Sequence, residues 1–374
     1  MISHFRTIKL LVLLIFLAIA ISACKSKTTV NIGFLSDLTE KQTHLGVPGK
    51  NAVLLAIDEY NKKSKKFNYN LNIKNDKCNT DQIEYIFHEF NSEKTNLIIG
   101  PYSAKIAEKL SKNNYFDSMD YLFVSPIVTS DKFMGKKDGF FSVASKNSEQ
   151  GKLLAQDAVE KGVKKVAIVC QVNKIYYYQA MLDSFTSLIE NNNGEVVYYK
   201  YYLDNEFPNF EKIAKEIIHS DAEAVLSVSG AYDSAELFQY IRKENQKIRF
   251  FLSMEAKTEE FIYNGGKAVE GSIIASVQED KDNLEFGKFL ENYKKLYGEN
   301  PNFSSVCSYQ ATIMLLEAIE KNGSTEPATI KKYFEETLNF KEISMDFTIN
   351  ENGDSIRPYT LYRVENGQYI RVIK

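Results

Sequence analysis

Two kinds of hydrophobic pattern alternate along this chain. Short apolar runs of strand length are followed by longer segments in which apolar residues recur every three or four positions, as on one face of a helix. In residues 48–63, for example, Val53, Leu54, Ile57 and Tyr60 fall on one such face. The pattern predicts strands over residues 29–38, 69–76, 97–99, 121–127, 164–171, 195–203, 223–230, 249–255 and 271–278. It predicts helices over residues 48–63, 79–93, 102–112, 149–162, 176–194, 209–220, 234–245, 283–298, 309–323 and 327–338, and hairpins over 345–354 and 358–374.

This alternation of strands and helices determines the expected architecture. Successive strand–helix units place their strands in parallel, with helices on both faces of the sheet. Around residues 140–151 the pattern restarts, and the second set of units is similar in size to the first. The 374 residues are enough for two domains. The sequence therefore predicts an α/β protein with two doubly wound, parallel-sheet lobes.

The segment LIIGPYSAKIAEKL, residues 97–110, joins a predicted strand to a predicted helix. Its apolar residues follow helical spacing after the Gly-Pro pair, so Ser103 falls at the helix start. The first N–H groups of a helix have no partner within it, and the helix dipole leaves partial positive charge there. The junction therefore favours an anionic ligand. The alternative is that Ser103 only caps the helix.

The N-terminus has the layout of an export signal. Two basic residues precede the uncharged run 10–21, which is too short to span a bilayer and is followed by small residues and Cys24. This layout resembles a bacterial lipobox, so we expect residues 1–23 to be a signal peptide, Cys24 to carry lipid, and residues 24–29 to form a tether. The protein would then be held by its lipid at the extracytoplasmic face of the cell membrane, in the periplasm or at the cell surface. An uncleaved N-terminal anchor is the alternative, and it places the protein at the same face.

Charge and residue types exclude several classes of partner. The net charge is −3, and removal of the predicted signal peptide, which contains Arg6 and Lys9 and no acids, brings it near −5. The basic surface typical of nucleic-acid binding is therefore absent. Cys78, Cys170 and Cys307 are an odd number in an oxidising compartment, so at least one should be free or buried. The four histidines lack ligand spacing, and we expect no metal, no cofactor and no nucleic-acid partner.

The common enzyme motifs are missing from the sequence. It contains no G-x-G-x-x-G fingerprint, no P-loop, no G-x-S-x-G nucleophile elbow and no H-E-x-x-H helix. Acidic residues are numerous, so a carboxylate pair for glycan processing stays open as an alternative, although no pair stands out. The sequence therefore contains no motif that points to an enzyme of these classes.

A series of segments resembles one known family in order and spacing. The first are IGFLSDLTEKQTHLGVPGKNAVLLAIDEYN and LIIGPYSAKIAEKL followed by FVSPIVTSD. Then come VAIVCQVN with YYYQAMLDSF, SVSGAYDSAELFQYIRKEN, FFLSMEAKTEEFIYNGGKAVEGSIIAS and YKKLYGENPNFSSVCSYQATIMLLEAIEKNG. Together they cover essentially the whole mature chain. They resemble the type I periplasmic solute-binding proteins, in particular the branched-chain amino-acid (leucine/isoleucine/valine) binding proteins of ABC transporters.

That resemblance implies two lobes that close over a small ligand, with three connections between the lobes forming a hinge. It places lobe 1 at residues 28–145 plus 276–340 and lobe 2 at residues 146–275 plus 341–374. It also implies that the protein is not an enzyme and that its ligand lies in the crevice at the carboxyl ends of the strands. The implied partners are an amino acid or similar small polar solute, an ABC permease, and the membrane through the lipid anchor.

The same resemblance implies a set of ligand-binding residues. The ligand carboxylate would be met at two loops, the ammonium group by an acid at the end of a strand, and the remainder by aromatic and large apolar side chains. The two loops contribute Ser103, Ala104, Val128 and Thr129, the acid is Glu255, and the aromatic and large apolar side chains are Tyr177, Tyr232 and Leu45. Alternatively, Glu255 is a solvated acid at a strand end and Tyr177 belongs to an ordinary aromatic cluster.

Two departures from the family pattern bear directly on the ligand. The serine that binds the ligand carboxylate in the family aligns with Ala104, and Tyr178 occupies a place where a small residue is common. These departures keep a second class of function open. In that class the protein is a ligand-free lipoprotein of the same fold that acts through protein contacts, as an activator of a cell-wall enzyme or as part of a sensor.

Overall fold

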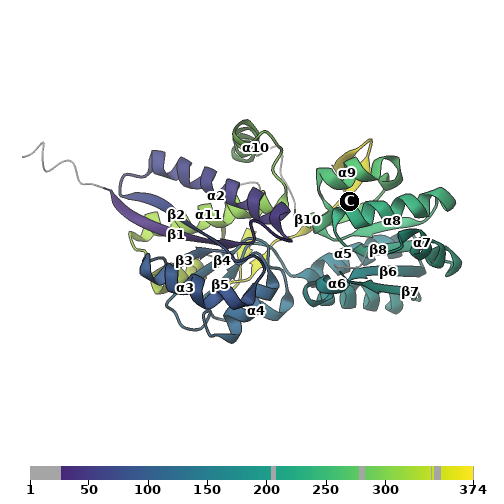
Figure 1. Cartoon of the computed structure of the whole chain (residues 1–374), viewed down its shortest axis with the longest axis horizontal. Coiled ribbons are helices and arrows are strands. Elements are labelled where there is room, and N and C mark those ends of the chain that lie inside the picture. Colours follow the sequence, from purple (N-terminus) through teal and green to yellow (C-terminus); the bar gives the residue numbers. More distant parts are fainter. Residues whose placement is uncertain (1–26, 204–207, 278–282, 338, 341–346, 374) are drawn as a thin grey trace, which may run out of the picture.

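The computed structural model describes residues 27–203, 208–277, 283–337, 339–340 and 347–373, and of residues 173–177, 339, 340 and 347 it describes the backbone only (Figure 1). The predicted signal peptide and the lipidation site Cys24 lie outside this range. Cys170 and Cys307 are fully buried, as predicted.

The first lobe is built on a five-stranded parallel sheet with the order β2-β1-β3-β4-β5. Two of its inner strands, β3 and β4, are short, mostly apolar and fully buried, as expected where helices cover both faces of a sheet. Helices α2, α10, α11 and α12 pack on one face and α3 and α4 on the other. The strands are β1 (Thr28–Ser36), β2 (Phe67–Asn75), β3 (Leu97–Ile99), β4 (Leu122–Ser125) and β5 (Phe140–Ser142).

The second lobe is built on a seven-stranded sheet with the order β15-β14-β10-β9-β8-β6-β7. Five of its strands are parallel, and the C-terminal hairpin adds β14 and β15 in antiparallel fashion. Helices α5 and α6 pack on one face, and α7, α8 and α9 on the other. The strands are β6 (Lys165–Gln171), β7 (Glu195–Tyr202), β8 (Ala224–Val228), β9 (Arg249–Leu252), β10 (Ile273–Val277), β14 (Tyr359–Glu365) and β15 (Gln368–Arg371).

Helices fill the space around both sheets, and Figure 1 shows the two lobes side by side. The α-helices are α2 (Thr43–Lys63), α3 (Ile83–Ser92), α4 (Ala104–Lys112), α5 (Asn147–Glu160), α6 (Val172–Asn191), α7 (Phe210–His219), α8 (Ala231–Glu244), α9 (Glu259–Gly265), α10 (Leu284–Tyr297), α11 (Phe303–Asn322) and α12 (Pro327–Glu336). Four 3-10 helices are η1 (Thr80–Gln82), η2 (Asp131–Phe133), η3 (Met254–Ala256) and η4 (Gly266–Val269). A small third sheet joins β11 (Asn339–Phe340), β12 (Phe347–Ile349) and β13 (Ser355–Ile356).

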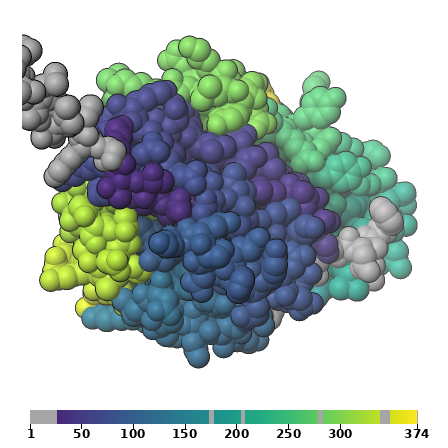
Figure 2. All heavy atoms as spheres, turned by 60° about the vertical axis from the view of Figure 1, so that its left-hand side comes forward, coloured from purple at the N-terminus to yellow at the C-terminus, as the bar shows by residue number. Residues whose placement is uncertain are grey.

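The chain passes between the two large sheets three times, after β5, after β10 and before β14. The C-terminal third of the chain therefore contributes to both lobes. Figure 2 shows its residues, green to yellow, beside the purple and blue N-terminal residues on one face. The small sheet lies next to β5, because Asp354 bridges to Ser142. The lobe boundaries given above stay a prediction.

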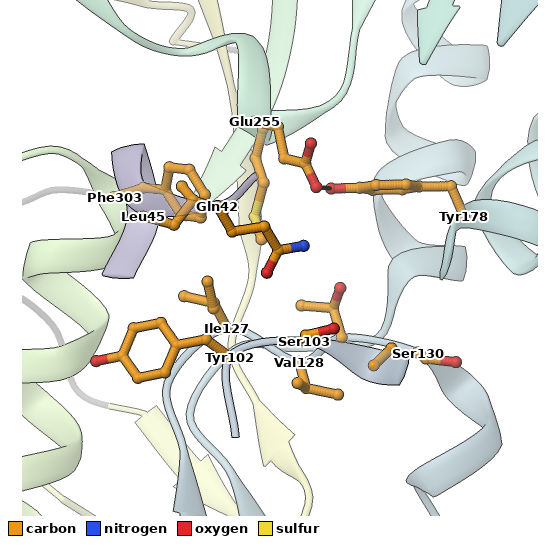
Figure 3. Close-up of a pocket in the computed structure, with 13 residues that line it drawn as sticks. Gln42, Leu45, Tyr102, Ser103, Ile127, Val128, Ser130, Tyr178, Glu255 and Phe303 are labelled. Atoms are coloured by element: carbon orange, nitrogen blue, oxygen red, sulfur yellow. Dashed lines mark hydrogen bonds between the residues drawn. The ribbon is translucent and has the colours of Figure 1, made fainter. Parts of the chain in front are cut away.

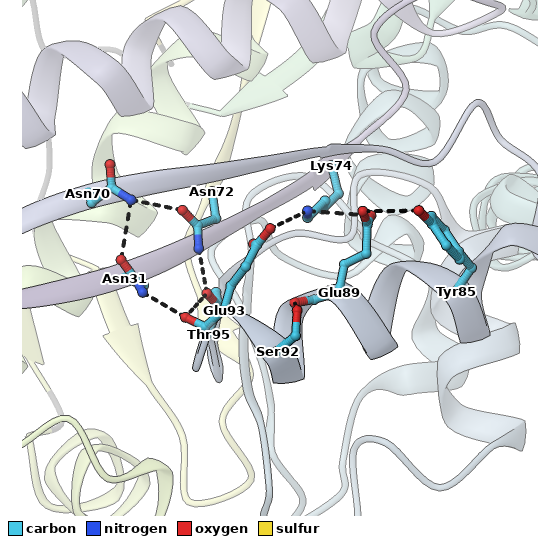
Figure 4. Close-up of polar contacts among 9 residues, drawn as sticks. All are labelled: Asn31, Asn70, Asn72, Lys74, Tyr85, Glu89, Ser92, Glu93 and Thr95. Carbon is cyan, nitrogen blue, oxygen red and sulfur yellow. Dashed lines mark hydrogen bonds and ion pairs between the residues drawn. The ribbon is translucent and has the colours of Figure 1, made fainter.

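A row of side-chain hydrogen bonds crosses one face of the first sheet, from the edge strand β2 to β1 and to Thr95 before β3. Figure 4 shows a row of amides in which Asn70 Nδ2 donates to Asn31 Oδ1 at 3.2 Å and to Asn72 Oδ1 at 2.8 Å. Asn72 Nδ2 donates in turn to Thr95 Oγ1 at 2.7 Å. Lys74, on the same strand, forms ion pairs with Glu89 of α3 and with Glu93 directly after that helix. This row ties the edge strand to its neighbours through side chains as well as through the backbone ladder.

Two helices begin five or more residues earlier than their patterns predict. Helix α2 starts at Thr43 rather than at residue 48, and α11 starts at Phe303 rather than at residue 309. The start of α2 contains glycines that look like loop residues, but packing requires them. A Cβ on Gly46 would lie 1.9 Å from the carbonyl oxygen of Asp37. The first turns of this helix therefore form because of tertiary contacts and not because of intrinsic helix propensity.

Replacing Gly46 by alanine should destabilise the protein by about 1–3 kcal/mol, because the added methyl group meets backbone that no side-chain rotation can move. Gly287→Ala is the matched control, since Gly287 is also inside a helix and its Cβ would meet nothing within 4 Å. That control should gain about 0.5–1 kcal/mol from helix propensity. Denaturant midpoints of the two variants measure both effects, and shifts of the same sign would contradict the proposed contact.

Candidate functional site

A pocket lies between the two lobes, at the carboxyl ends of the parallel strands (Figure 3). Lobe 1 lines it with the start of α2, the start of α4, the loop after β4 and the start of α11, and lobe 2 with α6 and η3. This is the place where open α/β sheets bind ligands. The lining residues are Gln42, Leu45, Tyr102, Ser103, Ala104, Ile127, Val128, Thr129, Ser130, Tyr178, Met254, Glu255 and Phe303.

Ser103 occupies the N-cap position of α4, but its side chain caps nothing. The residue is only 3% exposed, and its hydroxyl has no hydrogen-bond partner within the described part of the chain. The reading of Ser103 as a simple helix cap is therefore wrong. A buried hydroxyl and the first N–H groups of a helix instead lie together at the wall of the pocket, where both favour an anion.

The neighbouring loop after β4 is fixed by hydrogen bonds that shape the pocket. Ser125 Oγ donates to the carbonyl of Pro101 at 2.8 Å and accepts the N–H of Val128 at 3.2 Å, so it ties this loop to the start of α4. The hydroxyl of Thr129 donates to Asn147 Oδ1 at 2.6 Å. Of the two hydroxyls predicted to meet the ligand carboxylate, that of Thr129 is thus engaged with the protein, which leaves Ser103 as the stronger candidate.

On the side of lobe 2, Glu255 follows β9 on the short helix η3. The hydroxyl of Tyr178 donates to Glu255 Oε1 at 2.8 Å, and Figure 3 shows the ring of Tyr178 reaching the carboxylate from α6. Burial raises the pKa of Tyr178 well above its usual range, and the charge of Glu255 raises it further. The phenol therefore stays protonated and acts as a donor that orients the carboxylate.

A chain of buried side chains connects the two halves of the pocket. Thr129 donates to Asn147 Oδ1, which also accepts from Gln150 Nε2 at 2.8 Å. Gln150 Oε1 accepts the N–H of Met254 at 3.2 Å. All four residues are buried, so each of these bonds lies in a medium of low dielectric constant. The start of η3 in lobe 2 is thus fixed relative to the loop after β4 in lobe 1.

The loop between β1 and α2 is organised by the carboxylate of Asp37. Burial disfavours its charge, but it accepts the N–H groups of Gln42, Glu40 and Thr39, and these bonds hold the pKa of Asp37 below its usual value. The loop therefore presents Gln42 and Leu45 to the pocket from a fixed backbone.

A second acid, Asp76, lies behind this loop. It is fully buried, and burial raises its pKa to about 6, with the N–H of Cys78 opposing the shift and the charge of Asp37 adding to it. The thiol of Cys78 donates to Asp37 Oδ2 at 3.6 Å. Burial raises the pKa of this thiol to about 12, and the two carboxylates add to the shift, so it stays protonated and is no nucleophile.

The structure brings most of the predicted site residues together. Leu45, Ser103, Ala104, Val128, Thr129 and Glu255 line the pocket. Tyr232 does not: it lies at the start of α8, is 56% exposed and is absent from the lining. The side chain of Tyr177 lies outside the described residues. The prediction missed Gln42, Tyr102, Ile127, Ser130, Met254 and Phe303, and it named Tyr178 only as a residue that narrows the cleft.

Most of these missed residues are sequence neighbours of predicted ones. Tyr102 precedes Ser103, Met254 precedes Glu255, and Ile127 and Ser130 flank the predicted pair of the loop after β4. Their position next to predicted site residues was therefore a signal by which they could have been identified. No pattern in the sequence marks Phe303, because the early start of α11 places it at the pocket.

Comparison with known proteins gives the family. The family model described as periplasmic binding protein matches residues 29–368. The chain belongs to the periplasmic binding protein family. Proteins of this family bind solutes outside the cytoplasm and are not enzymes. In this binding protein, no helix of the described residues is long and apolar enough to cross a membrane, and no cluster of metal-ligating side chains occurs among them.

Relatives of this binding protein support the same assignment. Leu/Ile/Val-binding protein homolog 1 of Brucella melitensis is 21% identical over 287 residues, which cover 75% of this chain and 75% of that protein. A leucine binding protein from Thermotoga maritima superposes with a TM-score of 0.79 at 22% identity, covering 92% of this chain and 98% of that one. A solute binding protein of an ABC transporter from Rhodopseudomonas palustris, in complex with 3,4-dihydroxybenzoic acid, gives a TM-score of 0.80 at 16% identity, with 92% and 96% covered. The predicted family and two-lobed fold are thus confirmed.

Stability should fall as the pH rises from about 4 to 6, because the folded protein holds the proton of Asp76 up to a pKa of about 6 whereas the unfolded chain releases it near the model value of 3.8. The contribution of Asp76 is at most about 3 kcal/mol, fully present below pH 4 and lost above pH 6. Asp76→Asn should make this fall shallower in denaturant titrations across that pH range. Asp221→Asn, at a side chain that is 82% exposed, is the control and should leave the slope unchanged.

Proposed function

We propose that this protein captures an α-amino acid between its lobes and delivers it to an ABC permease, held at the membrane by lipid on Cys24. The observation that carries the proposal is the arrangement of Ser103 and Glu255 on opposite sides of one pocket (Figure 3). The unpartnered hydroxyl and the start of α4 suit a carboxylate, and Glu255 suits an ammonium group. A ligand that carries both groups satisfies both ends.

The acid in the pocket favours an amino acid over a simple carboxylic acid. A ligand that carries a carboxylate and no cation would bring a second negative charge towards Glu255. At an effective dielectric constant of 20, two like charges about 4 Å apart cost roughly 4 kcal/mol. An ammonium group turns this repulsion into an attraction.

The division of the site between lobes supports capture by closure. The carboxylate partner belongs to lobe 1 and the ammonium partner to lobe 2, so one ligand holds the two lobes together. Ligand binding then shifts the population towards the closed form, and a permease that recognises this form receives loaded protein.

The bond between Tyr178 and Glu255 favours a second candidate function. Because the phenol already donates to the carboxylate, the site has an internal partner where a ligand would otherwise bind. In this candidate the protein binds no solute and acts through contacts with a cell-wall enzyme or a sensor. Absence of any thermal shift with amino acids or aromatic acids, together with co-purification of such an enzyme, would favour it over transport.

Glu255→Gln should weaken amino-acid binding by roughly 10- to 100-fold, because a hydrogen bond to a charged group is replaced by a neutral one of the same shape. Isothermal titration with the twenty amino acids identifies the ligand on the wild-type protein and measures the loss in the variant. Glu260→Gln, at an exposed acid of α9, is the matched control and should bind as the wild type does. Equal affinity in Glu255→Gln and wild type would remove the proposed ammonium site.

Ser103→Ala should also weaken binding, by about tenfold, since it removes a hydroxyl that can donate to the ligand carboxylate. The unliganded protein should unfold at an unchanged or higher temperature, because the hydroxyl has no partner in the described structure to lose. Ser111→Ala, in the last turn of the same helix, is the control. Weaker folding with unchanged affinity would show that Ser103 serves the fold and not the ligand.

A further inference from the structure

Gln42 places an amide in the pocket to which the proposed function assigns no role. Its side chain is directed into the space between Glu255 on one side and Ser103 on the other (Figure 3). The oxygen Oε1 is buried and has no hydrogen-bond partner among the residues that the structure describes. A buried carbonyl group without a partner is unfavourable, so the position of this group needs an explanation.

The backbone of Gln42 is held in place from both directions. Its N–H donates to Asp37 Oδ2 at 2.8 Å, and its carbonyl accepts the N–H groups of Leu45 and Gly46, each at 2.9 Å. The residue is the N-cap of α2, so the helix and the Asp37 turn both fix where its side chain begins. The amide is therefore largely preorganised, which reduces the entropy that a ligand must remove to use it.

Among the residues whose side chains the structure describes, the other groups around this part of the pocket do not supply a partner. Leu45, Ile127 and Phe303 form an apolar wall on the same side of the pocket. The hydroxyl of Tyr102 lies 2.5 Å from Ser308 Oγ, and that of Tyr178 donates to Glu255. An aliphatic ligand side chain packed against this wall would offer the amide of Gln42 no hydrogen bond.

We propose that Gln42 is a specificity-determining residue and that the ligand is an amino acid with an uncharged hydrogen-bonding side chain, such as a hydroxyl or an amide. The inference rests on the amino-acid function proposed above and names the class of that ligand. An amide offers both a donor and an acceptor, and a rotation of 180° exchanges them, so either kind of group finds a partner. It offers no net charge, and therefore gives no compensation for a charged side chain.

Discrimination follows from the unpaired amide rather than from size. A site built to make a hydrogen bond rejects the analogue that lacks the group, because the polar atom of the protein is then buried unpaired. Apolar walls alone separate such isosteres poorly. We therefore expect a preference of about tenfold or more for the polar member of each pair of similar shape.

The test uses pairs of amino acids that differ in polarity but little in shape: threonine with valine, asparagine with leucine, and glutamine with methionine. Isothermal titration of the full chain should show that the polar member of the best-bound pair binds at least about tenfold more tightly. In Gln42→Met and Gln42→Leu this ratio should fall to near one or reverse. Gln156→Met, at an exposed glutamine of α5, is the control and should keep the ratio of the wild type.

The outcomes separate this inference from the function on which it rests. Binding of valine, leucine or methionine as tight as that of the polar partner, or a ratio unchanged in both Gln42 variants, overturns the role of Gln42 and leaves the amino-acid function intact. Binding of 3,4-dihydroxybenzoate in place of any amino acid overturns the amino-acid function, and with it the class of ligand proposed here. The role of Gln42 is then decided by comparing 3,4-dihydroxybenzoate with benzoate in the wild type and both variants. If no amino acid and neither aromatic acid binds, both proposals fall.

Thermal unfolding of the unliganded protein shows whether the Gln42 variants are folded. Because Oε1 has no partner to lose among the described residues, Gln42→Met should unfold at the same temperature as the wild type or higher. A lower unfolding temperature in both Gln42 variants would show that the amide serves the fold, and would overturn the assignment to a ligand.

Discussion

The buried chain of hydrogen bonds from Thr129 through Asn147 and Gln150 to Met254 is the constraint on which the site depends. It crosses from the loop after β4 to the short helix that carries Glu255. Each polar atom in it is removed from water, so a broken link would leave a buried donor or acceptor unpaired. Any opening of the cleft must therefore pivot about this chain or break it. The chain sets the distance between the part of the pocket that suits an anion and the part that suits a cation.

The fold could be predicted from the sequence because each strand and helix has its own hydrophobic pattern and these patterns alternate along the chain. Most buried strands are apolar runs and most helices show an apolar face, so the order of units specifies two sheets of mainly parallel strands. The missed starts of α2 and α11 have a common physical reason. Gly46 and Gly49 look like helix breakers, yet neighbouring side chains and backbone leave no room for a Cβ at either position. The buried serines at the start of α11 interrupt its apolar pattern in the same way, since Ser304 donates to the carbonyl of Leu45. The residue types at such positions are determined by contacts with residues far away in the sequence.

The site was predictable where it depends on topology and unpredictable where it depends on the path of one loop. Residues at the carboxyl ends of β3, β4 and β9 meet in any fold of this kind, so Ser103, Thr129 and Glu255 were within reach of the sequence. Gln42 enters the pocket only because Asp37 turns the loop after β1 with three hydrogen bonds to backbone N–H groups. No hydrophobic periodicity in the sequence indicates that turn. The hydroxyl of Ser103 was also ambiguous, since a serine at a helix start most often caps it.

The backbone and the side chains divide the work of recognition between them. A leucine binding protein and a solute binding protein in complex with 3,4-dihydroxybenzoic acid share the fold of this chain, so the fold itself does not select the ligand. The start of α4 presents N–H groups whatever its side chains are, and this suits the carboxylate that an amino acid and an aromatic acid have in common. Selection must then come from side chains that differ between members of the family. In the proposals made above, Glu255 distinguishes ligands by charge, and Gln42, on a loop held by Asp37, distinguishes them by polarity. The residues that form the cleft and the residues that choose its occupant are therefore largely separate sets, which allows one architecture to serve many solutes.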